Sequence, residues 1–278
     1  MLMTLRLTFV LLVLMAAATV RGGESPVIIE PGVAGKLSLP AAGKPRQAVL
    51  LLHGWNGSMD EVGNLYADLA EALQARGIAS LRFDFSGEGE RVGFVVTSTL
   101  DSRISESKAA FEHLREKVPD ASYGVVGFSL GGLTAMMVAG EEPSWFKSMV
   151  LWSAAQEMRM AGDAGYNRAV RQAITEGRGT FTSYAEITLT REFLLSFLGV
   201  NARARLAAYP GALLAIRGDN DFLATYDPEW LQLVPTREKA FLMIGGADHI
   251  FNVLDKPRPA YGERVIEATA DWLARTLD

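Results

Sequence analysis

Hydrophobic positions along the chain fall into short continuous runs, separated by longer segments in which they recur every three or four residues. Residues 47–53 (QAVLLLH) form a continuous run, which predicts a strand buried on both faces of a sheet. Residues 60–75 instead place Leu65, Leu69 and Leu73 at helical spacing. The chain therefore alternates between patterns typical of buried strands and patterns typical of amphipathic helices.

The same pattern predicts elements along most of the sequence. Strands are expected at residues 27–30, 35–39, 47–53, 78–85, 123–128, 149–153, 212–216 and 239–244. Helices are expected at residues 60–75 (with Ser58 as N-cap and Gly77 just past the end), 104–118, 130–139 and 263–277. Strands that alternate with crossover helices predict an α/β fold, with a mostly parallel central sheet and helices on both faces.

Residues 156–209 interrupt this alternation. The segment is polar, rich in arginine and broadly helical in pattern, with no run that indicates a strand. It is too long for an ordinary loop. We therefore expect a small helical cap, inserted over one edge of the sheet.

The first eighteen residues have the pattern of a targeting segment. Arg6 is their one charged residue, Leu7–Met15 is apolar apart from Thr8, and Ala16–Ala18 are small. This order is typical of a secretory signal peptide, and the apolar run is shorter than the ~20 residues that a membrane span needs. We expect cleavage after Ala18, export to the periplasm or medium, a mature domain at residues 19–278, and no lasting membrane anchor.

Composition excludes several kinds of site. The 278 residues include 27 Lys and Arg against 32 Asp and Glu, a formal net charge of −5, so no basic surface for nucleic acid is expected. The absence of cysteine excludes disulfides, zinc–thiolate sites and a cysteine nucleophile. Three histidines leave little for a metal site, and the glycines of Gly87–Gly93 are spaced one residue too widely for a dinucleotide-binding loop. We therefore expect no metal and no cofactor.

The segment Gly127–Gly131 (GFSLG) carries the strongest chemical signal. It follows a predicted strand and opens a predicted helix, and a Gly-x-Ser-x-Gly sequence at that junction forms a sharp turn that lifts the serine hydroxyl clear of the sheet. Gly127 and Gly131 are needed because a side chain would collide with the neighbouring strand or helix. The start of the helix also directs N–H groups toward developing negative charge. Ser129 is the predicted nucleophile.

A serine hydroxyl needs a general base, which one of three histidines must supply. His113 lies in the middle of a predicted helix and is interpreted as structural. His53 and His249 both follow strands, and parallel sheets place their chemistry at the carboxyl ends of strands. The order serine, acid, histidine along the chain favours His249.

The acid that orients this histidine should follow another strand, between Ser129 and His249. The loop after residues 212–216 offers Asp219 and Asp221. One of them must accept the second ring N–H of His249, which fixes the tautomer of the imidazole. The spacing alone does not separate the two aspartates.

Five motifs together resemble the α/β-hydrolase superfamily, over residues 47–277. They are HGW (His53–Trp55), DFSGEGE (Asp84–Glu90), GFSLGG (Gly127–Gly132), GDND (Gly218–Asp221) and GADH (Gly246–His249). The resemblance implies the α/β-hydrolase fold. It also implies that Asp221 is the acid of a catalytic triad with Ser129 and His249, which leaves Asp219 structural.

The same resemblance assigns the residues that would stabilise the oxyanion. It places the two oxyanion-hole N–H groups on Trp55 and Leu130. His53 and Gly54 are then supporting residues, with the imidazole of His53 bracing the oxyanion loop.

Two stretches resemble a smaller group, the feruloyl (cinnamoyl) esterases and serine-aminopeptidase-like hydrolases. They are RFDFSGEGE and LTREFLLSF (Leu189–Phe197), although Ser86 and Glu90 depart from the usual residues of that group. The expected function is therefore that of an exported serine hydrolase that cleaves small carboxylic esters through an acyl-enzyme. An aminopeptidase or amidase, and an acyltransferase or perhydrolase, would use the same residues. The intact serine, aspartate and histidine argue against a binding protein without catalysis.

Overall fold

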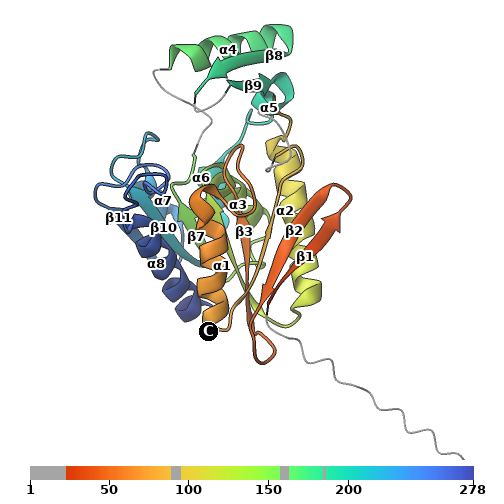
Figure 1. Cartoon of the computed structure of the whole chain (residues 1–278), viewed down its shortest axis with the longest axis vertical. Helices are drawn as coiled ribbons and strands as arrows, with labels where there is room; N and C mark the ends of the chain where they lie inside the picture. The colour runs from red at the N-terminus through yellow and green to blue at the C-terminus, as the bar shows by residue number, and fades with distance from the viewer. Residues whose placement is uncertain (1–22, 89–94, 157–162, 184–185) are drawn as a thin grey trace, which may run out of the picture.

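Eight strands form the central sheet of this computed structural model, which describes residues 23–88, 95–156, 163–183 and 186–278 (Figure 1). In spatial order the strands are β1 (Gly23–Glu30), β2 (Val33–Leu39), β4 (Ala79–Phe83), β3 (Gln47–Leu52), β6 (Ser122–Phe128), β7 (Ser148–Trp152), β10 (Ala212–Gly218) and β11 (Lys239–Ile244). Strand β2 pairs antiparallel with both β1 and β4, and every other pair in this sheet is parallel. The prediction of a mostly parallel sheet is confirmed.

Helices cover both faces of the sheet, as predicted. Helices α1 (Leu65–Ala75) and α8 (Tyr261–Thr276) pack on one face, and α2 (Leu100–Lys117) and α3 (Leu130–Glu141) pack on the other. Strand β3 shows how one strand serves both layers: Val49 and Leu51 join the hydrophobic cluster of α1 and α8, while Leu50 and Leu52 join that of α2 and α3. Burial on both faces explains why the strand is a continuous apolar run.

The starts of two helices differ from the prediction. Helix α1 begins at Leu65, after a short 3-10 turn at Val62–Asn64, and its N-cap is Asn64 rather than Ser58. Apolar spacing does not reveal the change, because Val62 keeps the helical period while Gly63 takes a positive φ of 61°. Helix α2 starts four residues earlier than expected, because Thr99 and Ser102 form a reciprocal capping box.

The cap contains strands as well as helices, so the prediction of a helical cap is wrong in this respect. Helix α4 (Ala164–Glu176) precedes strands β8 (Arg178–Thr182) and β9 (Glu186–Thr190), which pair antiparallel, and helix α5 (Arg191–Leu195) follows. Strand β9 also pairs with the short strand β5 (Val95–Val96). These elements lie above the central sheet in Figure 1. Strands β8 and β9 have five residues each, and most of these residues are polar. Their sequences therefore show little of the apolar alternation that predicts a strand.

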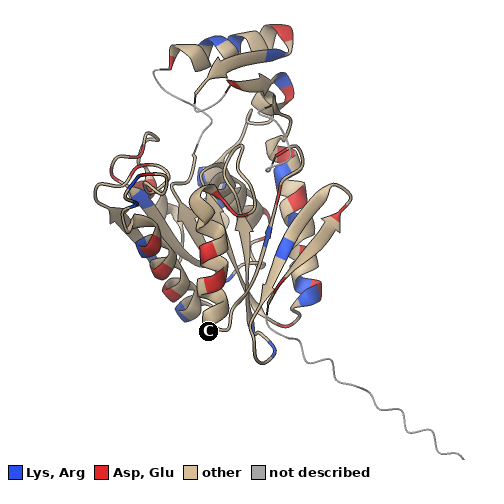
Figure 2. Ribbon diagram, in the orientation of Figure 1, with Lys and Arg blue, Asp and Glu red and all other residues tan. Residues whose placement is uncertain are grey.

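Two further helices complete the fold. Helix α6 (Ala202–Ala208) packs against α3, so the last part of the predicted insertion belongs to the main domain. Helix α7 (Asp227–Leu233) lies between β10 and β11 in sequence and packs on both strands. Acidic and basic residues are interspersed along α2, α4 and α8 (Figure 2).

The predicted signal peptide, residues 1–18, lies outside the described residues. Glu90, one of the departures from the feruloyl esterase pattern, also lies outside them. None of the described helices combines the length and the apolar character needed to cross a bilayer.

Candidate active site

Ser129 occupies a sharp turn between β6 and α3, as the sequence predicts. Its backbone has φ 51° and ψ −117°, and its N–H donates to the carbonyl of Trp152 at 2.9 Å. A Cβ atom on Gly127 would collide with the backbone of Gly131, and one on Gly131 would collide with the carbonyl oxygen of Leu52. Only glycine lets helix α3 start this close to the neighbouring strand.

The structure brings Ser129, His249 and Asp221 together from three separate loops at the carboxyl ends of β6, β11 and β10. The Nε2 atom of His249 lies 3.0 Å from the Oγ of Ser129, and its Nδ1 lies 2.8 Å from an Oδ1 of Asp221. The side chain of Asp221 is fully buried, whereas that of His249 is 11% exposed. With the proton on Nδ1, the imidazole donates to Asp221 and accepts from the serine hydroxyl.

A buried arginine holds the second oxygen of Asp221. Arg217 donates from Nη1 to Oδ2 of Asp221 at 2.6 Å, and from Nε to Asp227 at 2.6 Å. Burial would by itself raise the pKa of Asp221, but the hydrogen bond with His249 and the charge of Arg217 hold that pKa below its usual value. The carboxylate is therefore ionised at neutral pH, as it must be to stabilise an imidazolium.

Arg217 was missed in the sequence. It is the one charged residue of β10 (ALLAIRG) and stands directly before the GDND motif. Its third contact is a hydrogen bond from Nη2 to the carbonyl of Ala154 at 2.7 Å. A single charged residue in an otherwise apolar strand could have indicated this network, because a buried arginine requires hydrogen-bonding partners.

The other candidates from the sequence have different places. Asp219 is exposed, and its carboxylate accepts the N–H of Gly246 at 2.6 Å, which ties the loop after β10 to the loop after β11. His113 is half-buried on helix α2. Of the two aspartates that the spacing left open, Asp221 is the one that reaches His249.

Trp55 and Leu130, the residues predicted to supply the oxyanion-hole N–H groups, belong to two segments that lie beside Ser129. Leu130 is the first residue of α3, where the helix itself offers no acceptor. Trp55 follows β3 after Gly54, and no hydrogen bond among the described residues uses its N–H. A Cβ atom on Gly54 would lie 2.9 Å from the ring of Phe128 and 3.4 Å from the Cβ of Ser129, so glycine allows this loop to approach Ser129.

His53 is a buried, neutral residue behind this loop. Its Nδ1 lies 2.8 Å from the carbonyl of Gly54, and its Nε2 accepts the N–H of Phe85 at 3.1 Å. Burial is the main cause that lowers the pKa of His53 to about 4, with a smaller contribution from the charge of Arg103. The imidazole thus joins the loop after β3, which carries Trp55, to the loop after β4.

The side chain of Trp55 reaches into the cap. Its indole stacks between Phe181 of β8 and Phe193 of α5, with ring centroids 6.3 and 5.9 Å away. Phe193 is fully buried, and Phe197 packs edge-on against it at 5.1 Å. The loop after β3 and the cap therefore share one aromatic cluster.

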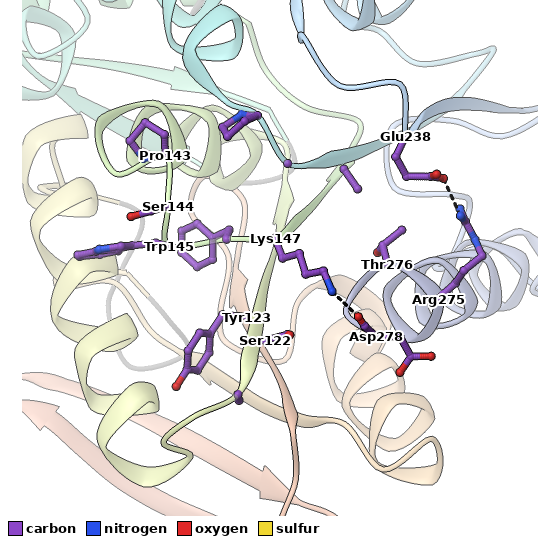
Figure 3. Close-up of a pocket in the computed structure, with 15 residues that line it drawn as sticks. Ser122, Tyr123, Pro143, Ser144, Trp145, Lys147, Glu238, Arg275, Thr276 and Asp278 are labelled. Carbon is purple, nitrogen blue, oxygen red and sulfur yellow. Dashed lines mark hydrogen bonds and ion pairs between the residues drawn. The ribbon is translucent and has the colours of Figure 1, made fainter.

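A large surface hollow lies at the opposite end of the strands. It has a volume of about 660 Å³ and is lined by the starts of β6 and β10 and the end of α8 (Figure 3). Charged groups in the hollow bind one another. Lys147 donates to the backbone oxygen of Asp278, and Arg275 donates to the carboxylate of Glu238 at 2.6 Å. Because Ser129 lies at the other end of the sheet, this hollow is not part of the candidate site. Among the described residues, no three His, Asp or Glu side chains gather in a possible metal site.

Comparison with known proteins finds a family model that matches residues 43–181, that of serine aminopeptidase, S33. This range includes Trp55 and Ser129 and ends before Asp221. Monoglyceride lipase of Mus musculus is 26% identical over 113 residues, 40% of this chain and 36% of the lipase. Esterase EstD of Thermotoga maritima is 29% identical over 120 residues, 42% of this chain and 29% of the esterase. The chain thus spans about a third of the length of these curated relatives.

Solved structures extend the likeness over most of the chain. Est1E from Butyrivibrio proteoclasticus, with ferulic acid bound, superposes with a TM-score of 0.71 and 17% identity, over 88% of this chain and 95% of Est1E. A monoacylglycerol lipase from Paleococcus ferrophilus gives a TM-score of 0.64 and 19% identity, over 86% and 98% of the two chains. At these identities the likeness establishes the shared fold.

Proposed function

The chain belongs to the serine aminopeptidase (S33) family of α/β-hydrolases, and from that premise we propose that it hydrolyses carboxylic esters through an acyl-enzyme on Ser129. One observation carries the proposal: Asp221, His249 and Ser129 form a continuous hydrogen-bonded chain. The names of the curated relatives, a lipase and an esterase, favour ester substrates over amides.

The proposed reaction has two halves. The Oγ of Ser129 attacks the ester carbonyl while the Nε2 of His249 takes its proton, and the N–H groups of Trp55 and Leu130 stabilise the oxyanion. The tetrahedral intermediate then expels the alcohol, which receives that proton from His249. Water enters, gives a proton to Nε2 and attacks the acyl-enzyme. Collapse of the second intermediate releases the carboxylic acid and returns the proton to Ser129.

Asp221 serves both halves of this cycle. It keeps the proton on Nδ1, so that Nε2 is free to accept one, and it stabilises the imidazolium that forms. Arg217 holds the carboxylate from the side away from His249, which prevents it from rotating out of line.

For the substrate we propose small esters with an aromatic acid, of the feruloyl type. Phe222 supports this choice, because its ring is 65% exposed and its centroid lies 4.5 Å from that of His249. An exposed aromatic face beside the reacting groups can stack on a flat acyl group. The ferulic acid bound to Est1E is consistent with the same substrate class.

We also propose that the protein is exported and that residues 1–18 are removed. The support is the order of Arg6, the apolar Leu7–Met15 and the small Ala16–Ala18. Expression of the full chain in a bacterial host, followed by fractionation and N-terminal sequencing, tests this. A mature protein outside the cytoplasm that starts near residue 19 is expected, and an uncleaved protein in the cytoplasm would contradict it.

The activity is tested with purified protein and a panel of substrates. The panel contains p-nitrophenyl esters of graded chain length, methyl ferulate, and an aminoacyl anilide as the amide control. We expect ester turnover that falls by about 10⁴ to 10⁶ in Ser129→Ala. Preference for the anilide would support an aminopeptidase instead, and a Ser129→Ala variant as active as the wild type would exclude the serine mechanism.

A further inference from the structure

Two buried carboxylates bind the backbone on either side of Trp55. The N–H of Gly54 donates to Oε2 of Glu61 at 2.7 Å, and the N–H of Asn56 donates to Oε2 of Glu88 at 2.6 Å. We propose that Glu61 and Glu88 are positioning residues that hold this loop so that the intervening N–H of Trp55 faces the substrate carbonyl. The inference rests on the proposed function, because it gives these residues a role in stabilising the oxyanion.

The N–H groups of Gly54, Trp55 and Asn56 follow one another in a loop outside the central sheet, and the two bonded groups fix the position of the one between them. Those of Gly54 and Asn56 are bound to Glu61 and Glu88 inside the protein. Glu88 is paired with Arg103, and a hydrogen bond to an ionised acceptor is stronger than one to a neutral acceptor. Asn56 has a positive φ of 52°, a left-handed conformation that asparagine adopts more readily than other non-glycine residues. Its N–H is held in that conformation by Glu88.

Each carboxylate is itself held in place. Glu61 precedes the 3-10 turn of Val62–Asn64 and accepts the N–H of Val62 with its other oxygen at 3.1 Å. Glu88 is fully buried, and its Oε1 is bound by the hydroxyl of Ser98 and by Nη1 of Arg103 at 2.5 Å. Both acceptors are therefore fixed by contacts outside the loop that they bind.

Arg103 links the network to the strand that carries the loop. It is a fully buried residue of α2, and its Nη2 donates to the carbonyl of His53 at 2.5 Å. Its guanidinium also lies 3.7 Å above the ring centroid of Phe85. Arg103 thus connects Glu88, which binds the N–H of Asn56, with His53, which precedes Gly54.

The charges argue for a role beyond stability. Arg103 is paired with Glu88, whereas the hydrogen-bond partners of Glu61 among the described residues are backbone N–H groups, and burying charge is unfavourable for folding unless each charge is paired. Burial raises the pKa of Glu61 to about 7, whereas burial of Glu88 is outweighed by the charge of Arg103 and by hydrogen bonds with Ser98 and Arg103, which hold its pKa below the usual value. A network built for stability alone would need no ionisable group at Glu61.

The test compares Glu61→Ala and Glu88→Ala with Glu61→Gln and Glu88→Gln, with p-nitrophenyl butyrate as substrate. Glu106→Ala is the matched control, because Glu106 is another poorly exposed carboxylate that accepts a loop N–H, that of Ser86 at 3.0 Å. Loss of one oxyanion donor lowers kcat by about 10² to 10³. We expect each alanine variant to lose about 10-fold or more in kcat with KM within about twofold, because only the transition state uses the oxyanion hole.

The second readout is the inhibition constant of a trifluoromethyl ketone, whose hemiketal oxygen occupies the oxyanion hole. It should rise in step with the fall in kcat for the two alanine variants and stay unchanged for Glu106→Ala. The glutamine variants keep an oxygen acceptor and should recover most of kcat. Folded alanine variants with wild-type kcat and inhibition would overturn the proposal.

Two further results separate the possible failures. If the alanine variants do not fold, Glu61→Asp and Glu88→Asp decide, since each acceptor is then one methylene too short: a lower kcat at constant KM supports positioning, and an unchanged kcat overturns it. A wild-type protein without Ser129-dependent ester turnover would instead contradict the proposed function itself.

Discussion

The indole of Trp55 lies nearly parallel to the phenyl ring of Phe193, with the planes inclined by 13° and the ring centroids 5.9 Å apart. Trp55 belongs to the candidate oxyanion loop and Phe193 to the cap. A displacement of the cap therefore changes the packing of the residue whose N–H would bind the oxyanion. This stack therefore attaches the cap to the loop that lies beside Ser129.

Phe193→Ala tests whether this part of the cap is structural. Because Phe193 is fully buried, we expect a loss of about 3–5 kcal/mol in the free energy of unfolding. Turnover of short and aromatic esters should fall together, since Trp55 serves every substrate. Melting temperature and the ratio of activities on p-nitrophenyl butyrate and methyl ferulate measure both effects. A changed ratio would assign substrate specificity to Phe193.

Phe222→Ala should change substrate preference and leave stability nearly unchanged, which is the opposite of the result expected for Phe193→Ala. The ring of Phe222 is 65% exposed, so the melting temperature should change little, while its contact with His249 places it beside the substrate. We expect kcat/KM for methyl ferulate to fall several-fold more than that for p-nitrophenyl butyrate, because stacking is worth about 1 kcal/mol. Leu254→Ala, at another exposed apolar residue, is the control. Equal losses on both esters would remove Phe222 from substrate recognition.

Asp221→Asn and Asp219→Asn should differ widely in activity. Asparagine at position 221 cannot fix the productive tautomer of His249, so kcat should fall by about 10⁴. Asp219→Asn loses only the charge in its bond to Gly246 and should keep most of the activity. Steady-state kinetics on one ester compare the two variants directly. The reverse order of effects would exchange their roles.

Glu61 should make stability depend on pH. Burial raises its pKa from 4.5 to about 7, so between these values the unfolded chain ionises first and folding becomes less favourable as pH rises. The free energy of unfolding of the wild type, relative to Glu61→Gln, should therefore fall by about 3 kcal/mol from pH 4.5 to pH 7 and stay constant above. Urea unfolding of both proteins at several pH values measures this difference.

Neighbouring groups do not mask the result. His53, Glu88, Tyr66 and Arg103 are the titratable or charged groups around Glu61. His53 has a lowered pKa of about 4 and destabilises the fold as pH falls below 6.5, which is the opposite trend. This contribution is common to both proteins and cancels in their difference. If the difference in unfolding free energy between the two proteins does not change with pH, the pKa of Glu61 is not raised in the folded protein.

The sequence predicts the parts of the candidate site that depend on local turns. Ser129, Asp221 and His249 each follow a strand, and a parallel sheet brings such positions to one edge. The contacts of Arg217, Glu61 and Glu88 were not predicted, because they join segments far apart in the chain and leave no periodic pattern. Strands β8 and β9 were missed for a related reason: they gain stability from pairing with each other and with β5, and their own apolar pattern is weak.

The backbone of Ser129 has a further consequence. At φ 51° and ψ −117° a residue with a Cβ atom is strained, by about 1–3 kcal/mol, and glycine would relieve that strain. Ser129→Gly should therefore yield a protein that unfolds at a higher temperature and hydrolyses nothing. Selection for thermal stability alone would favour the loss of the nucleophile, and a serine persists at this position only while its chemistry is under selection.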